Sequence, residues 1–194
     1  MEFIKQKIKV SQVLYLLLAN FFSVFAWGMF APIFALVVVD RGGSASQVGI
    51  AWGGYTLLTG ALMLIFGRIE DSYHMTKRLL VIGATALVVA SLVLLSFKTQ
   101  SGLIGSIVIF GFGFGMSMPA LKAIYGKLVD RGKEATEWAA MDGGNMLVMS
   151  GAAVIGGYLY QYASADVLYI AMTSVFLLSA LLYSLVISSF KNNF

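Results

Sequence analysis

The chain has 194 residues, of which 59% are hydrophobic and 11% are charged, and its mean hydropathy is +0.87. A soluble domain carries about 25% charged residues, so this composition excludes a soluble globule and predicts an integral membrane protein surrounded by the lipid bilayer. The net charge of +4 is spread over short segments between apolar runs, which excludes a nucleic-acid-binding patch. With no cysteine and one histidine, we expect no disulfide and no metal site.

Charged residues divide the sequence into six uncharged runs, each at least as long as the roughly 18 residues that a helix needs to cross a bilayer. A β-barrel is disfavoured because its strands need only about ten residues and alternate polar with apolar side chains. We therefore predict an all-α integral membrane protein with a single transmembrane domain over residues 1–194. The predicted transmembrane helices cover residues 11–38, 45–67, 78–97, 102–124, 137–160 and 165–188.

Lysine and arginine set the expected orientation, because they concentrate on the cytoplasmic side of membrane proteins. With the N-terminus in the cytoplasm, Arg41 and Lys98 lie outside and the other eleven of the thirteen basic residues lie inside. An even number of helices returns the C-terminus to the same side. Segments 68–77 and 125–136 are then cytoplasmic loops, and we expect a protein of a bacterial-type cytoplasmic (inner) membrane with both termini in the cytoplasm.

The segment FGRIEDSYHMTKRLLVIG, residues 66–83, places a dense polar cluster between two apolar runs. Gly67 would let a neighbouring helix approach closely. Asp71, at the membrane surface, could accept hydrogen bonds from the N-terminus of a facing helix. Lys77 and Arg78 would face the anionic inner leaflet and pair with the acidic residues. The alternative is an ordinary positive-inside loop, although topology alone requires neither the glycine nor the aspartate.

Gly67-Arg68-Ile69-Glu70-Asp71 followed by Lys77-Arg78-Leu79-Leu80 resembles the loop between helices 2 and 3 of the major facilitator superfamily. Ser72 stands where the family usually has a basic residue, and the usual glycine near His74 is missing. Two glycine-rich stretches follow in the family's order, Gly111-Phe112-Gly113-Phe114-Gly115 and Ile155-Gly156-Gly157-Tyr158-Leu159. The resemblance covers nearly the whole chain and implies one six-helix half, made of two three-helix repeats, without indicating which half.

The resemblance implies transport of a small solute by alternating access between two halves. A single half would expose its polar pathway wall to lipid, so we expect a parallel homodimer. In the family, this loop cluster fastens the inner ends of the two halves in one state; we call Gly67, Asp71, Lys77 and Arg78 the inner-end latch. The alternative is an isolated or truncated half that acts as a non-transport membrane module or as a subunit of a hetero-complex.

Helices 1, 2, 4 and 5 line the pathway in the family, which implies candidate residues on those helices. Several of them recur at helical spacing and so share one face of their helix. Polar residues of this kind also hold helices together, and aromatic or methionine stripes also serve packing, so a structural role is the alternative. The candidates are Asn20, Ser23, Trp27, Trp52, Tyr55, Thr59, Met116, Ser117, Asn145 and Met149.

Asp142 is the acidic residue that the predicted spans place furthest below the membrane surface. It is either a coupling acid or an acid that caps the N-terminal turn of the predicted helix 137–160. The sequence contains no phosphate loop, zinc-ligand spacing, catalytic triad or protected carboxylate pair, so we expect neither an enzyme nor a cofactor. The substrate, the coupling ion and the direction of transport stay open.

Overall fold

The computed structural model describes the backbone of residues 2–189 and the side chains of residues 12–187. The described part is helical and contains no strand. Its elements, in chain order, are α1 (Glu2–Phe30), a 3-10 turn (Ala31–Ile33), α2 (Phe34–Asp40), α3 (Ala45–Tyr73), α4 (Thr76–Ser96), α5 (Gln100–Leu128), α6 (Glu134–Tyr158), a π-helical turn (Leu159–Ala163) and α7 (Ala165–Ser189).

Within the described residues, five stretches are long and apolar enough to cross a membrane: Gln12–Asp40, Ala45–Tyr73, Thr76–Ser96, Gln100–Leu128 and Ala165–Ile187. These overlap the first four and the last of the predicted helices. The remaining predicted helix, residues 137–160, corresponds to α6. This helix is as long as α7, at 25 residues, but it is less apolar. Asp142, Asn145 and several glycines lower its hydropathy. Six spans therefore stay a prediction.

Three predicted boundaries differ from the structure. The first predicted helix is interrupted after Phe30, because Pro32 lies in the 3-10 turn that separates α1 from α2. The polar segment 68–77 is mostly helical rather than a loop, since α3 continues through its charged residues to Tyr73. His74 caps the C-terminus of α3: its φ of 54° is left-handed, and its N–H donates to the Glu70 carbonyl oxygen. The predicted loop 125–136 shortens to the five residues between α5 and α6.

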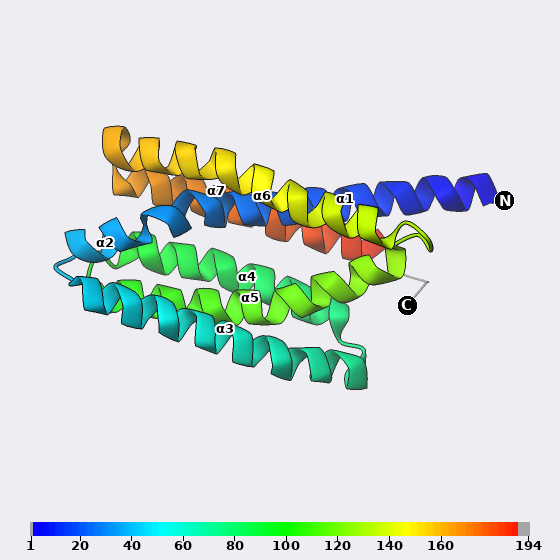
Figure 1. The fold of residues 1–194 in the computed structure, drawn as a ribbon, viewed down its shortest axis with the longest axis horizontal. Coiled ribbons are helices and arrows are strands. Elements are labelled where there is room, and N and C mark those ends of the chain that lie inside the picture. The colour runs from blue at the N-terminus through cyan, green and yellow to red at the C-terminus, as the bar shows by residue number, and fades with distance from the viewer. Residues whose placement is uncertain (1, 190–194) are drawn as a thin grey trace.

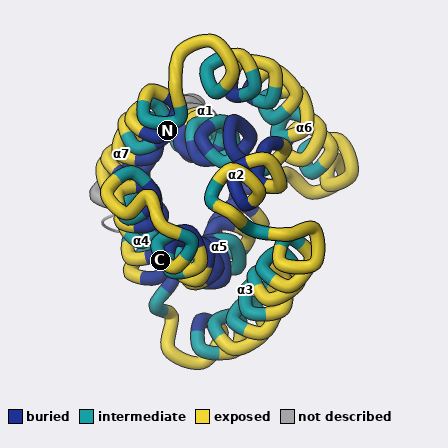
Figure 2. The backbone as a smooth tube through the Cα atoms, turned by 90° about the vertical axis from the view of Figure 1, so that its left-hand side faces the viewer, coloured by how far each residue is buried: buried dark blue, intermediate teal, exposed yellow. Residues whose placement is uncertain are grey.

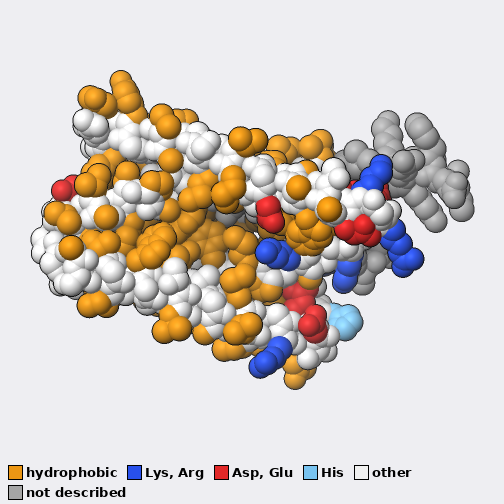
Figure 3. Space-filling view, viewed as in Figure 1, with side chains coloured by type: hydrophobic (Ala, Val, Ile, Leu, Met, Phe, Trp, Pro, Cys, Tyr) orange, Lys and Arg blue, Asp and Glu red, His pale blue; other side chains and the backbone are white. Residues whose placement is uncertain are grey.

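Successive long helices run back and forth along one axis (Figure 1). The start of α1, the α3–α4 connection, the α5–α6 connection and the end of α7 lie at one end of the molecule (Figure 1). Charged side chains gather at that same end, whereas the long middle of the visible face is nearly free of them (Figure 3). Such a division is typical of a protein whose middle lies in a hydrocarbon layer. We call this the charged end.

The helices form two neighbouring groups. In the first, α5 packs against α3 and α4; in the second, α1 packs against α6 and α7, and α4·α7 contacts join the groups. Glycines let α4 and α5 approach each other closely: a Cβ at Gly83 would lie 2.7 Å from the Gly113 carbonyl oxygen. The buried core surrounds Phe30 and Phe110 in one half of the length and Leu80 and Tyr125 in the other.

Two helices are much less covered than the rest. None of the most apolar stretch of α3 is buried, and along α6 Leu147 and Val154 are 76% and 73% exposed. In the end view, α3 and α6 stand out on one side, with α1, α2 and α5 set back between them (Figure 2). The side-on view shows this side hollowed between α6 and α3, with hydrophobic side chains over its floor (Figure 3). We call it the concave face.

Candidate functional site

The concave face brings together helices that are distant in sequence. Its rims are α3 and α6, and α1 and α5 lie between them, so these correspond to the helices predicted to line a pathway. Half of the ten predicted pathway residues meet in two groups, one polar and one aromatic, and the other five bond or pack locally.

The polar group joins α1, on the floor of the concave face, to the rim helix α6. Asn20 donates from Nδ2 to Oδ1 of Asn145 at 2.6 Å, although the two residues are 125 positions apart. Asn20 is 3% exposed and Asn145 is half-buried. The bond uses one N–H of Asn20 and the side-chain oxygen of Asn145, which leaves the Asn20 side-chain oxygen and both N–H groups of the Asn145 amide able to contact a solute. The structure thus places two predicted residues, found on separate helices, in one polar site.

The aromatic group lies between α1, α3 and α5. The Trp27 ring stacks on Trp52 at 6.1 Å with an interplanar angle of 16°, and it lies 5.2 Å from the Tyr55 ring. Phe110 and Phe114 of α5 contact the same indole edge-on or tilted, at 5.2 and 5.1 Å. The two phenylalanines are buried, whereas the indoles and the phenol are half-buried. The half-buried rings can therefore offer apolar and π surface to a ligand at the concave face.

The other predicted pathway residues make local contacts. The Thr59 hydroxyl donates to the Tyr55 carbonyl oxygen and the Ser117 hydroxyl to that of Gly113, both at 2.7 Å and both within one helix. Such bonds satisfy a hydroxyl in an apolar environment without requiring a ligand. Ser23 is buried, Met116 packs in the core near Tyr125, and Met149 lies against Gly28 of α1. For these five residues the structure offers no contact beyond packing and local bonds.

Asp142 does not lie in the first turn of α6. The helix begins at Glu134 rather than at residue 137, so Asp142 follows more than two turns later and the helix-cap interpretation is wrong. The first-turn acids are Glu134 and Glu137, whose carboxylates accept from the Gly132 N–H at 2.7 Å and the Asp130 N–H at 3.3 Å. The backbone N–H groups of Glu134 itself and of Gly132 lower the pKa of the Glu134 carboxyl. Asp142 is exposed and three residues before Asn145 on the same face.

The inner-end latch residues lie at the charged end of α3 and α4. Gly67 and Asp71 belong to the last turns of α3, and Lys77 and Arg78 to the first turn of α4. Among the residues that the structure describes, no ion pair joins Asp71 to Lys77 or Arg78. A Cβ at Gly67 would meet nothing within 4 Å, which shows that no helix of this chain uses the glycine for close approach.

Comparison with protein families gives a match over most of the chain. The sequence profile of the Major Facilitator Superfamily matches residues 16–192, which is most of the chain. The chain belongs to the major facilitator superfamily. Members of this superfamily are membrane transporters of small solutes, and the chain is short, as one half of such a transporter would be. The match confirms the resemblance carried by the loop signature and the glycine-rich helices. Comparison with curated proteins finds no match.

A buried acid in this major facilitator chain escaped the sequence analysis. Glu70, next to the latch aspartate, is 5% exposed, and its Oε2 atom has no hydrogen-bond partner among the described residues. A buried carboxylate oxygen without a partner destabilises the fold. Sequence alone gave no sign of this, because Arg68, Glu70 and Asp71 read as one solvated cluster, whereas the continuation of α3 turns Glu70 inward.

A polar network at the end opposite the charged end also went unrecognised. Arg41 donates from Nη1 to the carbonyl oxygens of Phe97 and Thr99 at 3.1 Å and from Nη2 to that of Leu94 at 3.3 Å. It thereby caps the C-terminus of α4, where carbonyl oxygens lack helical donors. The Tyr160 hydroxyl donates to the carboxylate of Asp40, the residue before Arg41. Lys98 forms an ion pair with Asp166 at 2.6 Å. The network ties together the connections at this end of the transporter.

The described residues contain no group of three or more histidine, cysteine or acidic side chains that could hold a metal ion. The candidate site of this major facilitator chain is the concave face, where the Asn20–Asn145 pair and the Trp27 ring cluster bring together five of the predicted pathway residues.

Proposed function

We propose that the protein transports a small solute by alternating access, with the concave face as one wall of the pathway. The main support for this proposal is that the concave face is not covered by other helices and is bordered by polar and aromatic side chains that could bind a solute. The Asn20–Asn145 pair and the half-buried rings of Trp27, Trp52 and Tyr55 belong to helices that border it. Polar side chains inside a membrane are costly unless they serve packing or a solute pathway.

We further propose that the opposite wall is a second copy of the chain, inserted in the same orientation. Leu57 on α3 and Leu147 on α6 are both 76% exposed, so both rims have apolar surface to bury. A two-fold axis along the membrane normal would place α3 of each copy against α6 of the other and enclose the concave faces. The transporter would then have twelve long helices, with both termini of each copy in the cytoplasm of a bacterial-type inner membrane.

The helix contacts support an internal repeat within each copy. If the α1–α2 pair, α3 and α4 form one unit and α5, α6 and α7 the other, each of the most extensive contacts between long helices has a counterpart. The α3·α5 contact corresponds to α6·α1, and α4·α5 corresponds to α7·α1, while α4·α7 is its own counterpart. This exchange makes α3 and α6 equivalent, which explains why both remain uncovered and supports their common role at the interface between copies.

The inner-end latch is proposed to act across that interface. Gly67 on α3 and Gly143 on α6 both have open space where a Cβ would stand, so the two helices could approach closely there. Asp71, exposed and without a partner in the described part of the chain, would then face α6 of the second copy near Gly143. Gly144 is less suitable as the contact point, because its Cβ position faces the Phe21 ring within the same copy.

Two measurements test this proposal. Uptake by proteoliposomes across solute classes should reveal a transported solute, and Trp52→Leu should reduce its uptake more than Trp138→Leu, whose ring packs on Tyr125 and not on the Trp27 ring cluster. An equal loss of uptake in the two variants would remove the aromatic group from the pathway, and no uptake of any solute by the unmodified chain would favour the non-transport module or the hetero-complex subunit.

For the dimer, Asp71→Cys in one copy and Gly143→Cys in a second, differently tagged copy should cross-link in native membranes. Since each copy carries one cysteine and the chain has none of its own, any link joins two copies. Lys98→Cys at the opposite end, paired with Gly143→Cys, is the control and should not link. If the first pair never links in any condition, the parallel homodimer is wrong.

A further inference from the structure

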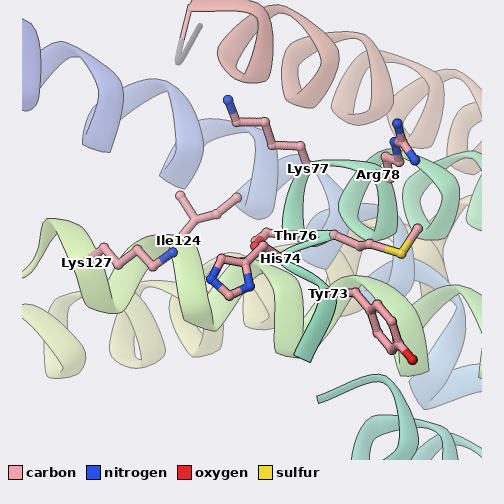
Figure 4. A pocket seen from close by; sticks show the side chains of 8 residues that line it. Tyr73, His74, Thr76, Lys77, Arg78, Ile124 and Lys127 are labelled. Atoms are coloured by element: carbon pink, nitrogen blue, oxygen red, sulfur yellow. The ribbon is translucent and has the colours of Figure 1, made fainter. Parts of the chain in front are cut away.

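Two cavities in the described part of the chain differ in how their polar side chains are arranged. The larger, of about 370 Å³, lies beside the α3–α4 connection. There the Lys77 and Arg78 side chains extend away from the His74 ring, so the polar groups do not converge on one ligand (Figure 4). The smaller, of about 10 Å³, lies among α1, α5 and α7, and all three helices contribute polar side chains to it. We call it the bundle pocket.

The polar groups of the bundle pocket are deeply buried. They are Asn20, Ser23, Ser117 and Tyr183, which are 3%, 6%, 7% and 3% exposed. The other residues that line the pocket are apolar. All four polar residues belong to stretches long and apolar enough to cross a membrane. A polar group in such surroundings destabilises the fold unless it has a hydrogen-bond partner.

Three of these side chains have polar atoms that no protein group satisfies. Among the described residues, the Ser23 and Tyr183 hydroxyls form no hydrogen bond. Asn20 donates from Nδ2 to Asn145, and its Oδ1 atom accepts no hydrogen bond from the described part of the chain. Two hydroxyls and one amide oxygen, all more than nine-tenths buried, thus border the same small pocket.

The bundle pocket presents two hydrogen-bond acceptors and two donors. The Ser117 hydroxyl donates its only hydrogen to the Gly113 carbonyl oxygen, so its oxygen can only accept from the pocket. The Asn20 Oδ1 atom is the second acceptor, whereas the Ser23 and Tyr183 hydroxyls can each donate. A water molecule donates two hydrogen bonds and accepts two, so one water can satisfy all four groups.

The size and the charge of the pocket fit a water molecule as well. A volume of about 10 Å³ accommodates one water and nothing larger. The lining contains no acidic, basic or histidine side chain. A sodium ion would therefore carry an unbalanced charge in apolar surroundings, and it would leave the hydroxyl hydrogens without an acceptor.

We infer that the bundle pocket binds one water molecule, which bridges the Asn20 amide oxygen to the hydroxyls on α1, α5 and α7. The water joins these three helices inside the membrane-spanning part of the chain. It also fixes the orientation of the Asn20 amide, whose N–H faces Asn145. Because an amide oxygen accepts two hydrogen bonds, one remains for a solute. The inference depends neither on transport nor on a second copy.

The sign of a stability change tests the bound water. Tyr183→Phe keeps the ring and removes the hydroxyl. With the water in place, the variant loses a hydrogen bond, so the Tm of the purified full chain should fall by about 2–4 °C, the shift for one bond in a chain of this length. Without the water, it removes a buried hydroxyl that has no partner and should raise Tm. An unchanged or raised Tm would overturn the inference.

A double-mutant cycle tests whether one molecule joins the two hydroxyls. Ser23 and Tyr183 form no hydrogen bond with each other in the described structure, yet the Tm shifts of Ser23→Ala and Tyr183→Phe should not add, because both remove a partner of the same water. Ser106→Ala is the matched control, since its fully buried hydroxyl donates to the Leu103 carbonyl oxygen within α5. Its shift should add to that of Tyr183→Phe. Additive shifts in both pairs would contradict a shared water.

Two further measurements identify the occupant. A crystal structure of the unmodified chain should show density for one water at about 2.5–3.0 Å from the Ser23, Ser117 and Tyr183 hydroxyl oxygens. Exchange of sodium for choline at constant ionic strength should leave Tm unchanged. A higher Tm in sodium that disappears in Tyr183→Phe would show that the pocket binds the ion, and the water assignment would be wrong. Neither result bears on the uptake measurements that test the proposed function.

Discussion

Asn20 and Asn145 form a hydrogen bond of 2.6 Å between α1 and α6, with Asn20 almost fully buried. The bond joins the floor of the concave face to one rim, so it couples the position of α6 to the rest of the chain. Removing one partner leaves the other amide without a hydrogen bond in an apolar environment. This lowers the stability of the fold by more than the net contribution of the hydrogen bond. The pair is thus a structural tie, and under the proposed function it is also a polar site for a solute.

A double-mutant cycle measures that tie. We expect Asn20→Ala and Asn145→Ala each to lower the free energy of unfolding in detergent, with a coupling energy of about 0.6 kcal/mol and at most about 1.7 kcal/mol, the range for bonds between membrane helices. The measurement is reversible unfolding of the four proteins. Strictly additive losses would show that the two amides do not interact in solution.

Gly156 should be intolerant of a side chain. A Cβ there would overlap the Met29 backbone of α1, which cannot move aside as a flexible side chain could. Gly156→Ala should therefore destabilise the protein by about 1–3 kcal/mol, as overpacking does, and lower its Tm. Gly151→Ala on the same helix is the matched control, since nothing lies within 4 Å of its Cβ position. Equal Tm changes in the two variants would contradict the α1–α6 packing.

Glu70 should be replaceable with a gain in stability. Its Oε2 atom is buried without a partner among the described residues, so Glu70→Met, which keeps the length and removes the charge, should raise Tm. Asp71→Asn, on the neighbouring exposed residue, should leave Tm nearly unchanged and serves as the control. A lower Tm for Glu70→Met would mean that the carboxylate has a partner, such as a residue of a second copy.

Orientation can be tested with single cysteines, because the chain has none. His74 and Lys98 are exposed at opposite ends of the molecule. An impermeant maleimide should label Lys98→Cys in intact cells and His74→Cys after permeabilisation, since most basic residues then lie inside. Arg131→Cys should behave like His74→Cys. The reverse labelling pattern would place the charged end outside and overturn the expected topology.

Asp142 is expected to matter for transport rather than for stability. It is exposed on the face of α6 that also carries Asn145, and the structure gives its side chain no hydrogen bond to lose. Asp142→Asn should keep the Tm of the unmodified protein and lose uptake driven by a pH gradient. Normal pH-driven uptake by this variant would show that Asp142 is not a coupling acid.

Glu134→Gln supplies the contrasting control for Asp142→Asn, because it removes the charged acceptor for the Gly132 N–H and should lower Tm while transport persists. The stability that Glu134 contributes to the unmodified protein depends on pH, because folding lowers the pKa of the Glu134 carboxyl. This contribution is fully present above the ordinary carboxyl pKa and is lost as the pH falls through the lowered pKa of the folded protein. Unfolding at neutral and acidic pH measures this loss.

Sequence reasoning was sufficient to identify a helical membrane protein of the major facilitator superfamily and to locate most of its helices to within a few residues. These properties depend on local quantities, namely the length and hydropathy of each run and the spacing of glycines and charges. The candidate pathway residues Asn20, Trp27, Trp52 and Asn145 were also found from spacing, because residues on one helix face recur with the helical period.

The contacts of those residues depend on how the helices pack and could not be predicted from the sequence. The chain has two prolines: Pro32 lies where α1 gives way to a 3-10 turn, whereas Pro119 lies inside the continuous helix α5. Each removes one backbone donor, and whether the helix continues depends on the packing around it. In the same way, Glu70 and Asp71 are adjacent acids, yet one is buried and the other exposed. Burial is fixed by contacts between helices distant in sequence, which no local pattern encodes.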